Sequence, residues 1–345
     1  MTRDGYILPF ALVAIAVIAI VSATAAGQVQ RASQSIGQLA DRSRMEAGLI
    51  SAEQTMLYLM LTEPMGPQGI EVGGAGNAFG LGGAASDEIE LVRADGSPRS
   101  FGEPPVIVRL FDDQSFLNLA TANEAVQVRN LSLFGLPRSQ AERLAATLAD
   151  YQDTDDLRRL GGAEARDYPG SAPPANRPIR DVLELCSVMG WSETEVCDDL
   201  GQLLLVGRAR YSDALNPRLP SLPLLQMMLA DDADARAAYR AMQRLEVVDF
   251  TSIGRPEFDE ESDPLSGPGY PGPTLILMTH PLAGAPIRRT VVELNTGSII
   301  APFFILSKYV IGGTEAQDFT AVEDVERVED IPEPATNSRS GGRQN

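Results

Sequence analysis

Five carboxylates lie close together in the middle of the chain, and their spacing suits the binding of a hard cation. They follow a helical pattern, and a Gly161–Gly162 pair interrupts them. The five are Asp153, Asp155, Asp156, Glu164 and Asp167. Calcium takes roughly 6–8 oxygen ligands, often from a loop with acids at alternate positions. Asp153 and Asp155 alternate in this way, but the two glycines come later than in an EF-hand, so a calcium-binding loop and a solvated acidic loop are both open interpretations.

The two cysteines of the chain, Cys186 and Cys197, flank a turn at Gly190–Trp191. A helical hairpin can bring such positions within the Cα separation of about 7 Å that a disulfide needs. A disulfide and a pair of buried free thiols are the two interpretations. Zinc is not expected, because His280 is the only histidine and lies far away in the sequence. We expect His280 to end a strand.

Catalytic patterns are missing from the sequence. It contains neither G-x-S-x-G nor H-E-x-x-H, and a single histidine cannot support most catalytic triads. Acid runs at 231–232 and 259–261 offer paired carboxylates for glycoside chemistry, but solvated surface charge is the favoured interpretation. The glycine-rich segment 64–87 lacks the spacing of a phosphate-binding loop. The sequence therefore predicts that the protein is not an enzyme.

The charge of the chain argues against one class of partner. It carries 47 acidic and 28 basic residues, a formal net charge of −19. Binding to nucleic acid relies on basic groups that neutralise phosphates, so no nucleic acid partner is expected.

The N-terminal stretch has no charged residue between Asp4 and Arg31. Its apolar part is long enough for a membrane helix, which needs roughly 20 residues. It can be a cleaved secretory signal, a plain signal anchor or a prepilin leader cut between Gly5 and Tyr6. The apolar run exceeds the core of an ordinary signal peptide, which argues against the first interpretation. The third is favoured because the short polar segment 1–5 ends in glycine directly before the apolar helix, as prepilin leaders do.

Strand patterns stand on both sides of a helical block. Alternating residues predict strands at 88–93 and 106–111 before the block. Others are predicted at 274–279, 287–294 and within 299–311 after it. Residues 94–97 are predicted to form a turn. This order predicts an antiparallel sheet interrupted by an inserted domain.

The helical block contains a weak internal repeat of the helix-hairpin-helix kind. In each unit a helix is followed by a glycine, Gly135 or Gly190, and then by a second helix. Ser139 and Ser192 are the predicted N-caps of these second helices. Acidic residues lie near the turns instead of a basic collar, so a packing role is expected.

The motifs of this block carry a specific resemblance. Residues 149–164 form a helix, an acidic loop and a Gly-Gly-Ala-Glu sequence, and Tyr168 follows. Together with 118–122, 176–178 and 181–185, they resemble the K-type minor pseudopilin of the type II secretion system. The specific motifs span about 116–200, and the general layout agrees from about residue 5 to 310.

This resemblance implies an α+β pseudopilin fold, in which a long N-terminal helix packs on an antiparallel sheet and a large all-α domain is inserted. The expected segments are a leader (1–5), the transmembrane and stalk helix (6–62), the first part of the α+β domain (63–115), the inserted helical domain (116–248), the second part of the sheet (249–311) and a disordered acidic tail (312–345).

Phe10 supports the same family. Most pseudopilins have Glu at the fifth mature position, which is Phe10 if cleavage follows Gly5. A Glu inside the bilayer needs a partner, thought to be the terminal amine of a neighbouring subunit. The K type is the family's exception, and the resemblance implies a subunit at the tip of the pseudopilus.

The resemblance also implies a set of partners and a location. Calcium is the expected cofactor, at the five carboxylates named above. The expected partners are the I-type and J-type minor pseudopilins, other pseudopilus subunits, prepilin peptidase, the inner membrane and secreted substrates. The chain would cross the inner membrane once, with its C-terminal domain in the periplasm. The alternative is a membrane-anchored periplasmic enzyme or ligand-binding protein.

Overall fold

The computed structural model describes residues 7–72, 90–121, 123–168, 174–209, 221–229, 232–243, 271–282, 286–295, 297–298, 300–312, 319 and 329–330. The predicted cleavage position at Gly5 and Tyr6 lies outside these residues, as do the leader and most of the C-terminal tail.

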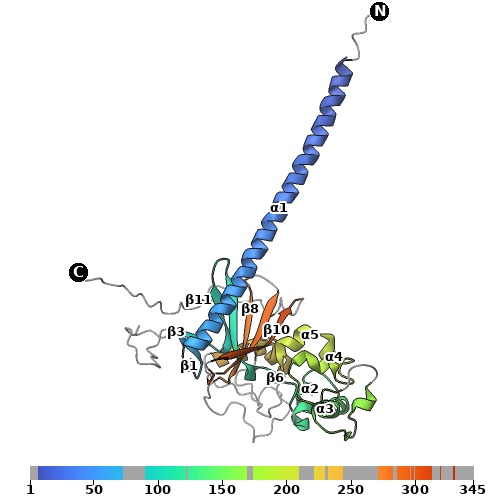
Figure 1. The fold of residues 1–345 in the computed structure, drawn as a ribbon, viewed down its shortest axis with the longest axis vertical. Coiled ribbons are helices and arrows are strands. Elements are labelled where there is room, and N and C mark those ends of the chain that lie inside the picture. The colour runs from blue at the N-terminus through green and yellow to red at the C-terminus, as the bar shows by residue number, and fades with distance from the viewer. Residues whose placement is uncertain are drawn as a thin grey trace, which may run out of the picture.

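One helix dominates the shape of the molecule. Helix α1 (Ile7–Thr62) is continuous over 56 residues and projects far beyond the rest of the chain (Figure 1). Phe10 lies in its first turn. Near its N-terminus α1 is long and apolar enough to cross a membrane, and its most apolar window is not covered by other parts of the described chain. These features are compatible with a single-pass membrane anchor.

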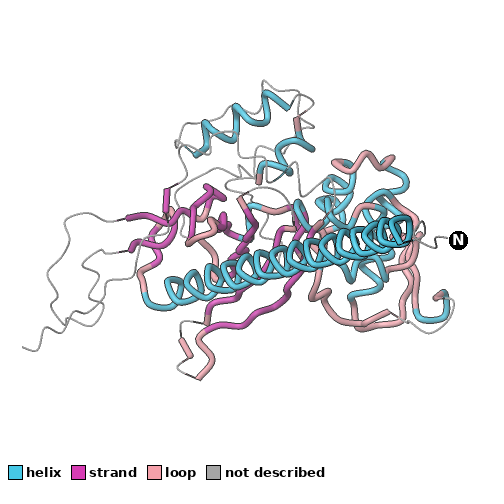
Figure 2. Tube along the Cα trace, turned by 90° about the horizontal axis from the view of Figure 1, so that it is seen from above, coloured by secondary structure: helices cyan, strands magenta, loops and turns pink. Residues whose placement is uncertain are grey.

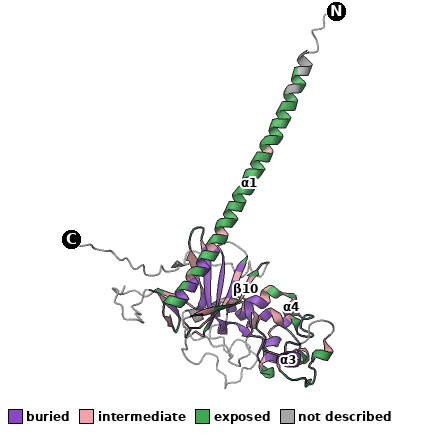
Figure 3. Cartoon of the chain, viewed as in Figure 1, coloured by how far each residue is buried: buried purple, intermediate pink, exposed green. Residues whose placement is uncertain are grey.

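The second half of α1 packs on a sheet. Its buried residues Leu49, Ala52, Met56 and Leu59 recur every three or four positions, which places them on one face. They share a core with residues of the sheet strands, among them Val106. Figure 3 shows the change from an exposed helix to one that covers buried strands.

Ion pairs add to this packing. Arg288 Nη2 lies 2.5 Å from Glu46 Oε1, and Lys308 Nζ lies 2.5 Å from Oε1 of Glu53, which is buried in α1. The hydroxyl of Thr290 donates to the same Glu53 oxygen at 3.3 Å. A long N-terminal helix packed on an antiparallel sheet is therefore observed, as predicted.

The sheet has the order β10-β9-β8-β5-β4-β11. Its strands are β4 (Asp95–Phe101), β5 (Val106–Asp112), β8 (Thr274–Pro281), β9 (Ile287–Leu294), β10 (Phe303–Ile311) and β11 (Glu329–Asp330). All neighbours are antiparallel except β11, which pairs in parallel with β4. Strands β5 and β8 are direct neighbours although the helical block separates them in the sequence, so the prediction of an interrupted sheet is confirmed.

A second, smaller sheet begins directly after the C-terminal end of α1. It consists of β1 (Met65–Gly66), β2 (Gly69–Val72) and β3 (Glu90–Arg93), all antiparallel. Figure 2 shows α1 running across the strands of the molecule, seen from above.

The turn predicted at residues 94–97 is wrong, because most of this segment begins β4. Its pairing with β5 shifts between Asp95 and Pro98, which marks an irregularity of the β-bulge kind. Gly96 has a φ of 80°, and the Asp95 carboxylate accepts a hydrogen bond from Ser97 N at 2.9 Å. The turn-forming residues therefore kink a strand without reversing the chain.

The inserted unit is mainly helical, as predicted. Its helices are α2 (Glu124–Ser132), α3 (Arg138–Gln152), α4 (Glu195–Asp198), α5 (Leu200–Val206), α6 (Leu222–Met228) and α7 (Asp232–Gln243). Short 3-10 helices η1 (Asp113–Ser115), η2 (Ala165–Asp167) and η3 (Val182–Ser187) connect them, and β6 (Leu117–Asn118) pairs in parallel with β7 (Gly207–Arg208).

Two predicted helix caps are wrong. Pro137, not Ser139, precedes α3, and Thr194, not Ser192, precedes α4. The glycines of the two repeat units have nearly equal φ angles, 79° at Gly135 and 81° at Gly190, a region that favours glycine.

The insert and the sheet share one core. Phe111 of β5 and Ile276 of β8 belong to the same buried cluster as Leu144 and Trp191 of the helical unit. Trp191 is fully buried, and its Nε1 donates to the carbonyl of Leu144 at 3.1 Å. The insert is therefore fused to the sheet by apolar packing.

The tail is not wholly as predicted. Phe319 is buried, with its ring 6.4 Å from the His280 ring and 5.2 Å from Arg109 Cζ. Strand β11 also falls within the segment 312–345. The prediction of a disordered tail is wrong at these two places, because the Phe319 side chain and the pairing of β11 with β4 attach these described residues to the sheet.

Candidate metal centre

The end of α3 delivers the first carboxylate of the acidic loop. The backbone N–H of Asp153 donates to Ala149 O at 3.1 Å, so Asp153 ends the helix. The chain then loops back and reaches η2 through Glu164, which directly precedes it. The two ends of the loop thereby meet.

Three of the five predicted ligands come together. Oxygen atoms of Asp153, Asp155 and Glu164 all lie within 4.8 Å of one another. Asp156 and Asp167 are not in this group. Asp167 accepts a hydrogen bond from the Glu164 N–H at 3.0 Å and faces Arg158. That backbone bond, helped by Arg158, lowers the pKa of Asp167, which keeps it an ionised acceptor.

Glu164 is the most unusual member of the group. It is only 2% exposed, and neither of its side-chain oxygens has a hydrogen-bond partner. Burial, together with the negative charges of Asp150 and Asp153, raises its pKa. A buried carboxylate normally has a hydrogen-bond or charged partner, so the two Glu164 oxygens are available as ligands that could hold a cation together with Asp153 and Asp155.

Arg159 neutralises part of this charge from one side. Its guanidinium binds Asp150 at 2.7 Å and also pairs with Asp153. These two carboxylates raise the pKa of Arg159 further above its ordinary value. One Asp153 oxygen is occupied in this way, while the other, Oδ1, is buried and has no partner.

The Gly161–Gly162 pair leaves room for the side chain of Asp150, a residue that was not among the predicted ligands. Asp150 is fully buried in α3 and accepts from the backbone N–H of Arg159 at 3.1 Å. A Cβ on Gly162 would lie 2.0 Å from Asp150 Oδ2, and Gly161 has a φ of 83°. The buried position of an acid on the apolar face of α3 was the available signal for Asp150.

Tyrosines join the acidic loop to the next part of the unit. The Tyr168 hydroxyl accepts from Met189 N at 3.1 Å, and its ring lies 6.4 Å from that of Tyr151. The Tyr151 hydroxyl donates to Glu184 at 3.3 Å. Burial, and then Glu184, raise the pKa of Tyr151 to about 12, so it stays protonated.

The structure joins Cys186 and Cys197 in a disulfide, with their Cα atoms 5.8 Å apart. The bond closes the hairpin that holds the buried Trp191.

His280 lies at the end of β8, as predicted, and has the surroundings of a core residue. Its Nδ1 is 2.8 Å from Pro281 O. Burial, followed by the nearby positive charge of Arg109, lowers its pKa to about 4. It is therefore neutral at physiological pH.

A model of a known protein family matches a large part of the inserted helical unit. The family model described as "Type II secretion system (T2SS), protein K" matches residues 112–203, from the end of β5 into α5. No curated protein matches the chain.

One solved structure with a similar chain is titled "The Crystal Structure of the GspK-GspI-GspJ complex from enterotoxigenic Escherichia coli Type 2 Secretion System". The two chains are 18% identical, the match covers 62% of this chain and 83% of the other, and the TM-score is 0.38. The matched residues 112–203 contain the acidic loop, Tyr168 and both cysteines. Residues 112–203 therefore match the protein K family of the type II secretion system, the minor pseudopilins that the sequence resembles.

Proposed function

We propose that this chain is a minor pseudopilin that starts or caps the type II secretion pseudopilus. The observation that carries the proposal is the position of residues 112–203, the segment that the protein K family model matches. In the sequence this segment begins at the end of β5 and precedes β8, and these two strands are neighbours in the sheet on which α1 packs. Pseudopilus subunits pack side by side through such helices, and a wide domain beside the sheet would obstruct neighbours within the filament. The tip is the place where it fits. The role is structural, not catalytic.

The N-terminus supports processing by prepilin peptidase. Cleavage after Gly5 would leave Tyr6 as the first residue and Phe10 as the fifth. An apolar fifth residue does not require the partner that a Glu there would need in the membrane. The proposed topology is a single pass through the inner membrane, with the folded part in the periplasm.

The exposed apolar face of α1 is suited to contact the helices of partner subunits. Val29, Ile36 and Leu39 are 65–69% exposed and lie on one helical face beyond the most apolar stretch. We assign this face to the I-type and J-type minor pseudopilins and other pseudopilus subunits, with secreted substrates as further partners.

Calcium is the proposed cofactor of the acidic loop. Asp153, Asp155 and Glu164 would be its ligands, with Asp156 and Asp167 outside the group of three. A divalent cation would satisfy the buried Glu164 oxygens and offset the repulsion among the carboxylates.

Co-purification tests the assembly role. The tagged chain, expressed in full with the I-type and J-type minor pseudopilins of its own secretion system, is expected to retain both. Ile36→Asp should weaken this retention, because it places a charge on the apolar face. Gln34→Asp, on the opposite face of α1, is the matched control and should retain both partners. Failure of the unaltered chain to retain either partner would contradict the proposal.

A further inference from the structure

Arg159 is a positive group placed inside the acidic loop, beside the proposed calcium ligands. Its Nη1 lies 2.7 Å from Asp150 Oδ1 and also pairs with Asp153 Oδ2. Its Nε lies 3.6 Å from Glu124 Oε1, in the first turn of α2. Through these three carboxylates the guanidinium joins α2, the C-terminal end of α3 and the loop.

The loop holds more negative charge than one arginine can neutralise. Oxygen atoms of Asp153, Asp155 and Glu164 lie within 4.8 Å of one another. The negative charge of the fully buried Asp150 also acts on Glu164. Carboxylates at this separation repel one another, and the repulsion is strongest where water is excluded.

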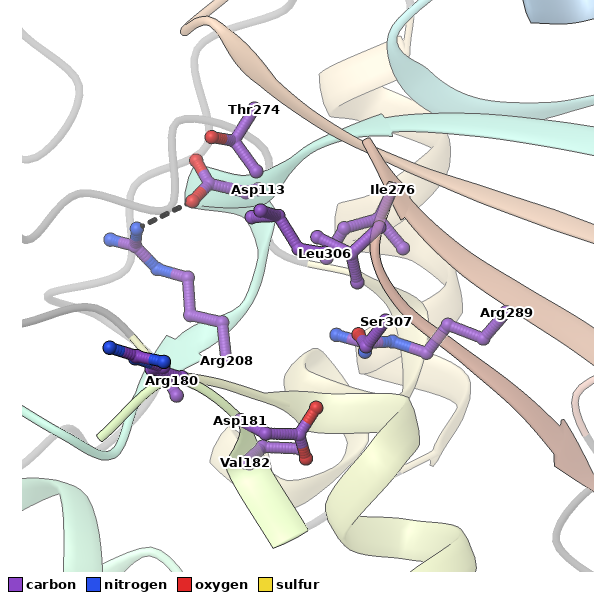
Figure 4. A pocket seen from close by; sticks show the side chains of 12 residues that line it. Asp113, Arg180, Asp181, Val182, Arg208, Thr274, Ile276, Arg289, Leu306 and Ser307 are labelled. Atoms are coloured by element: carbon purple, nitrogen blue, oxygen red, sulfur yellow. Dashed lines mark hydrogen bonds and ion pairs between the residues drawn. The ribbon is translucent and has the colours of Figure 1, made fainter. Parts of the chain in front are cut away.

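A buried ion pair elsewhere in the chain has a different charge balance. Arg208 Nη1 lies 3.0 Å from Asp113 Oδ2, so that a guanidinium faces a carboxylate, and both side chains are buried (Figure 4). In the acidic loop the guanidinium of Arg159 serves Asp150 and Asp153 together. Excess negative charge therefore remains in the loop even with Arg159 in place.

Asp153 is the residue that Arg159 and a bound cation would share. Its Oδ2 pairs with Arg159, while its Oδ1 is buried and has no hydrogen-bond partner. A cation held by Asp153, Asp155 and Glu164 would therefore use the same carboxylate as the guanidinium. Two positive charges on one carboxylate repel each other, so each weakens the binding of the other, and this coupling is reciprocal.

We propose that Arg159 is a built-in counter-ion that stabilises the acidic loop while the site is empty and lowers the affinity of the site for calcium. This inference rests on the calcium site proposed above and adds the residue that sets how tightly the site binds. A residue that only oriented Asp153 would have the opposite effect, because its loss would weaken calcium binding. The sign of the change in affinity therefore distinguishes the two roles.

Calorimetric titration of calcium into the full chain in detergent micelles tests the inference. Arg159→Gln removes the charge and keeps an amide that can donate a hydrogen bond. Its dissociation constant for calcium should be about tenfold lower than that of the unaltered chain. This value is in the lower part of the range of about 5–150-fold that is typical of coupled sites. We expect the lower part because the Arg159 side chain is 41% exposed, so that water screens its charge.

A charge-preserving variant and the melting temperature give further readouts. Arg159→Lys keeps the positive charge, so its affinity for calcium should stay close to that of the unaltered chain. In a chelator Arg159→Gln should melt at a lower temperature than the unaltered chain, because the carboxylates lose their counter-ion. Saturating calcium should remove most of this difference, since the tighter-binding variant gains more from the ligand.

Arg158→Gln is the matched control. Arg158 is the preceding residue, its side chain is 51% exposed, and it pairs with Asp167, which lies outside the group of three. Its loss should leave the affinity for calcium nearly unchanged.

The outcomes separate this inference from the calcium site itself. If the unaltered chain binds calcium and Arg159→Gln binds it equally or more weakly, the inference is overturned and the site stands. If neither chain binds calcium, the site is refuted and the inference with it. Neither result bears on the role in the pseudopilus.

Discussion

At the residue scale, a substitution of Glu164 tests whether the acidic loop is a metal site or a solvated loop. Glu164→Gln removes the buried charge and keeps the shape of the side chain. In a chelator the variant should melt at a higher temperature than the unaltered chain, because it lacks the repulsion from Asp150 and Asp153. Added calcium should stabilise the unaltered chain and not the variant.

The pH dependence of stability follows from the raised pKa of Glu164. A carboxyl whose pKa is higher in the folded than in the unfolded state binds its proton more readily when folded. Its contribution to stability is therefore present at low pH and is lost as the pH rises through the folded pKa, which lies above 4.5. This loss should disappear in Glu164→Gln and in calcium.

Asp156→Asn is the matched control for these measurements. Asp156 lies in the same loop but outside the group of three carboxylates, so calcium should still stabilise this variant. A melting temperature of the unaltered chain that is the same in calcium and in chelator would contradict the proposed site.

Gly162 offers a second test at this scale. Gly162→Ala would bring a methyl group against Asp150 Oδ2, where a Cβ would be 2.0 Å away. The expected loss is about 1–3 kcal/mol in the free energy of unfolding, typical of overpacking. Gly297→Ala, at a position with no atom within 4 Å, is the control and should change little. Denaturant titration measures both, and equal stability of the two variants would show that Gly162 is not in close contact.

The acidic loop could be predicted from the sequence, but its internal arrangement could not. Proximity in the sequence suggested five ligands, while the structure brings three together because Asp167 turns back to the Glu164 N–H. Asp150 and Arg159 were missed, since their pairing depends on how the loop folds back over α3. A chain reversal of this kind produces no periodic residue pattern from which the pairing could be predicted.

At the scale of elements, the disulfide is the clearest test. Cys186 and Cys197 are 11 residues apart, and closing a loop of that length stabilises a fold by roughly 3 kcal/mol. Replacing both cysteines by alanine should lower the free energy of unfolding by about this amount. A reductant should destabilise the unaltered chain and not the double variant, and an equal effect on both would argue against the bond.

The elements were predictable where their pattern is regular. Strands β5, β8 and β9 have the expected positions because alternating or continuous apolar residues reveal them. The first residues of β4 were predicted as a turn because Asp95, Gly96 and Ser97 favour turns locally. Pairing with β5 overrides that preference, and such long-range pairing is not visible from local residue types.

At the scale of the whole molecule, the interrupted sheet could be predicted because strand patterns enclose a helical block. What the sequence did not reveal is that both parts share one core, in which Phe111 and Ile276 pack with Leu144 and Trp191. That packing holds the helical unit beside the sheet at the base of α1. It is the arrangement on which the proposed position at the filament tip depends.

Whether the chain is a processed pseudopilin is decided by the intact mass of the mature protein. The full chain would be expressed with the prepilin peptidase of its own secretion system, purified from the inner membrane and measured by mass spectrometry. Gly5→Val is the matched control, because it should block cleavage and leave the leader attached. We expect a mature chain that begins at Tyr6, and a mature chain that begins near Ala26 or Gly27 would show that the protein is not processed as a pseudopilin.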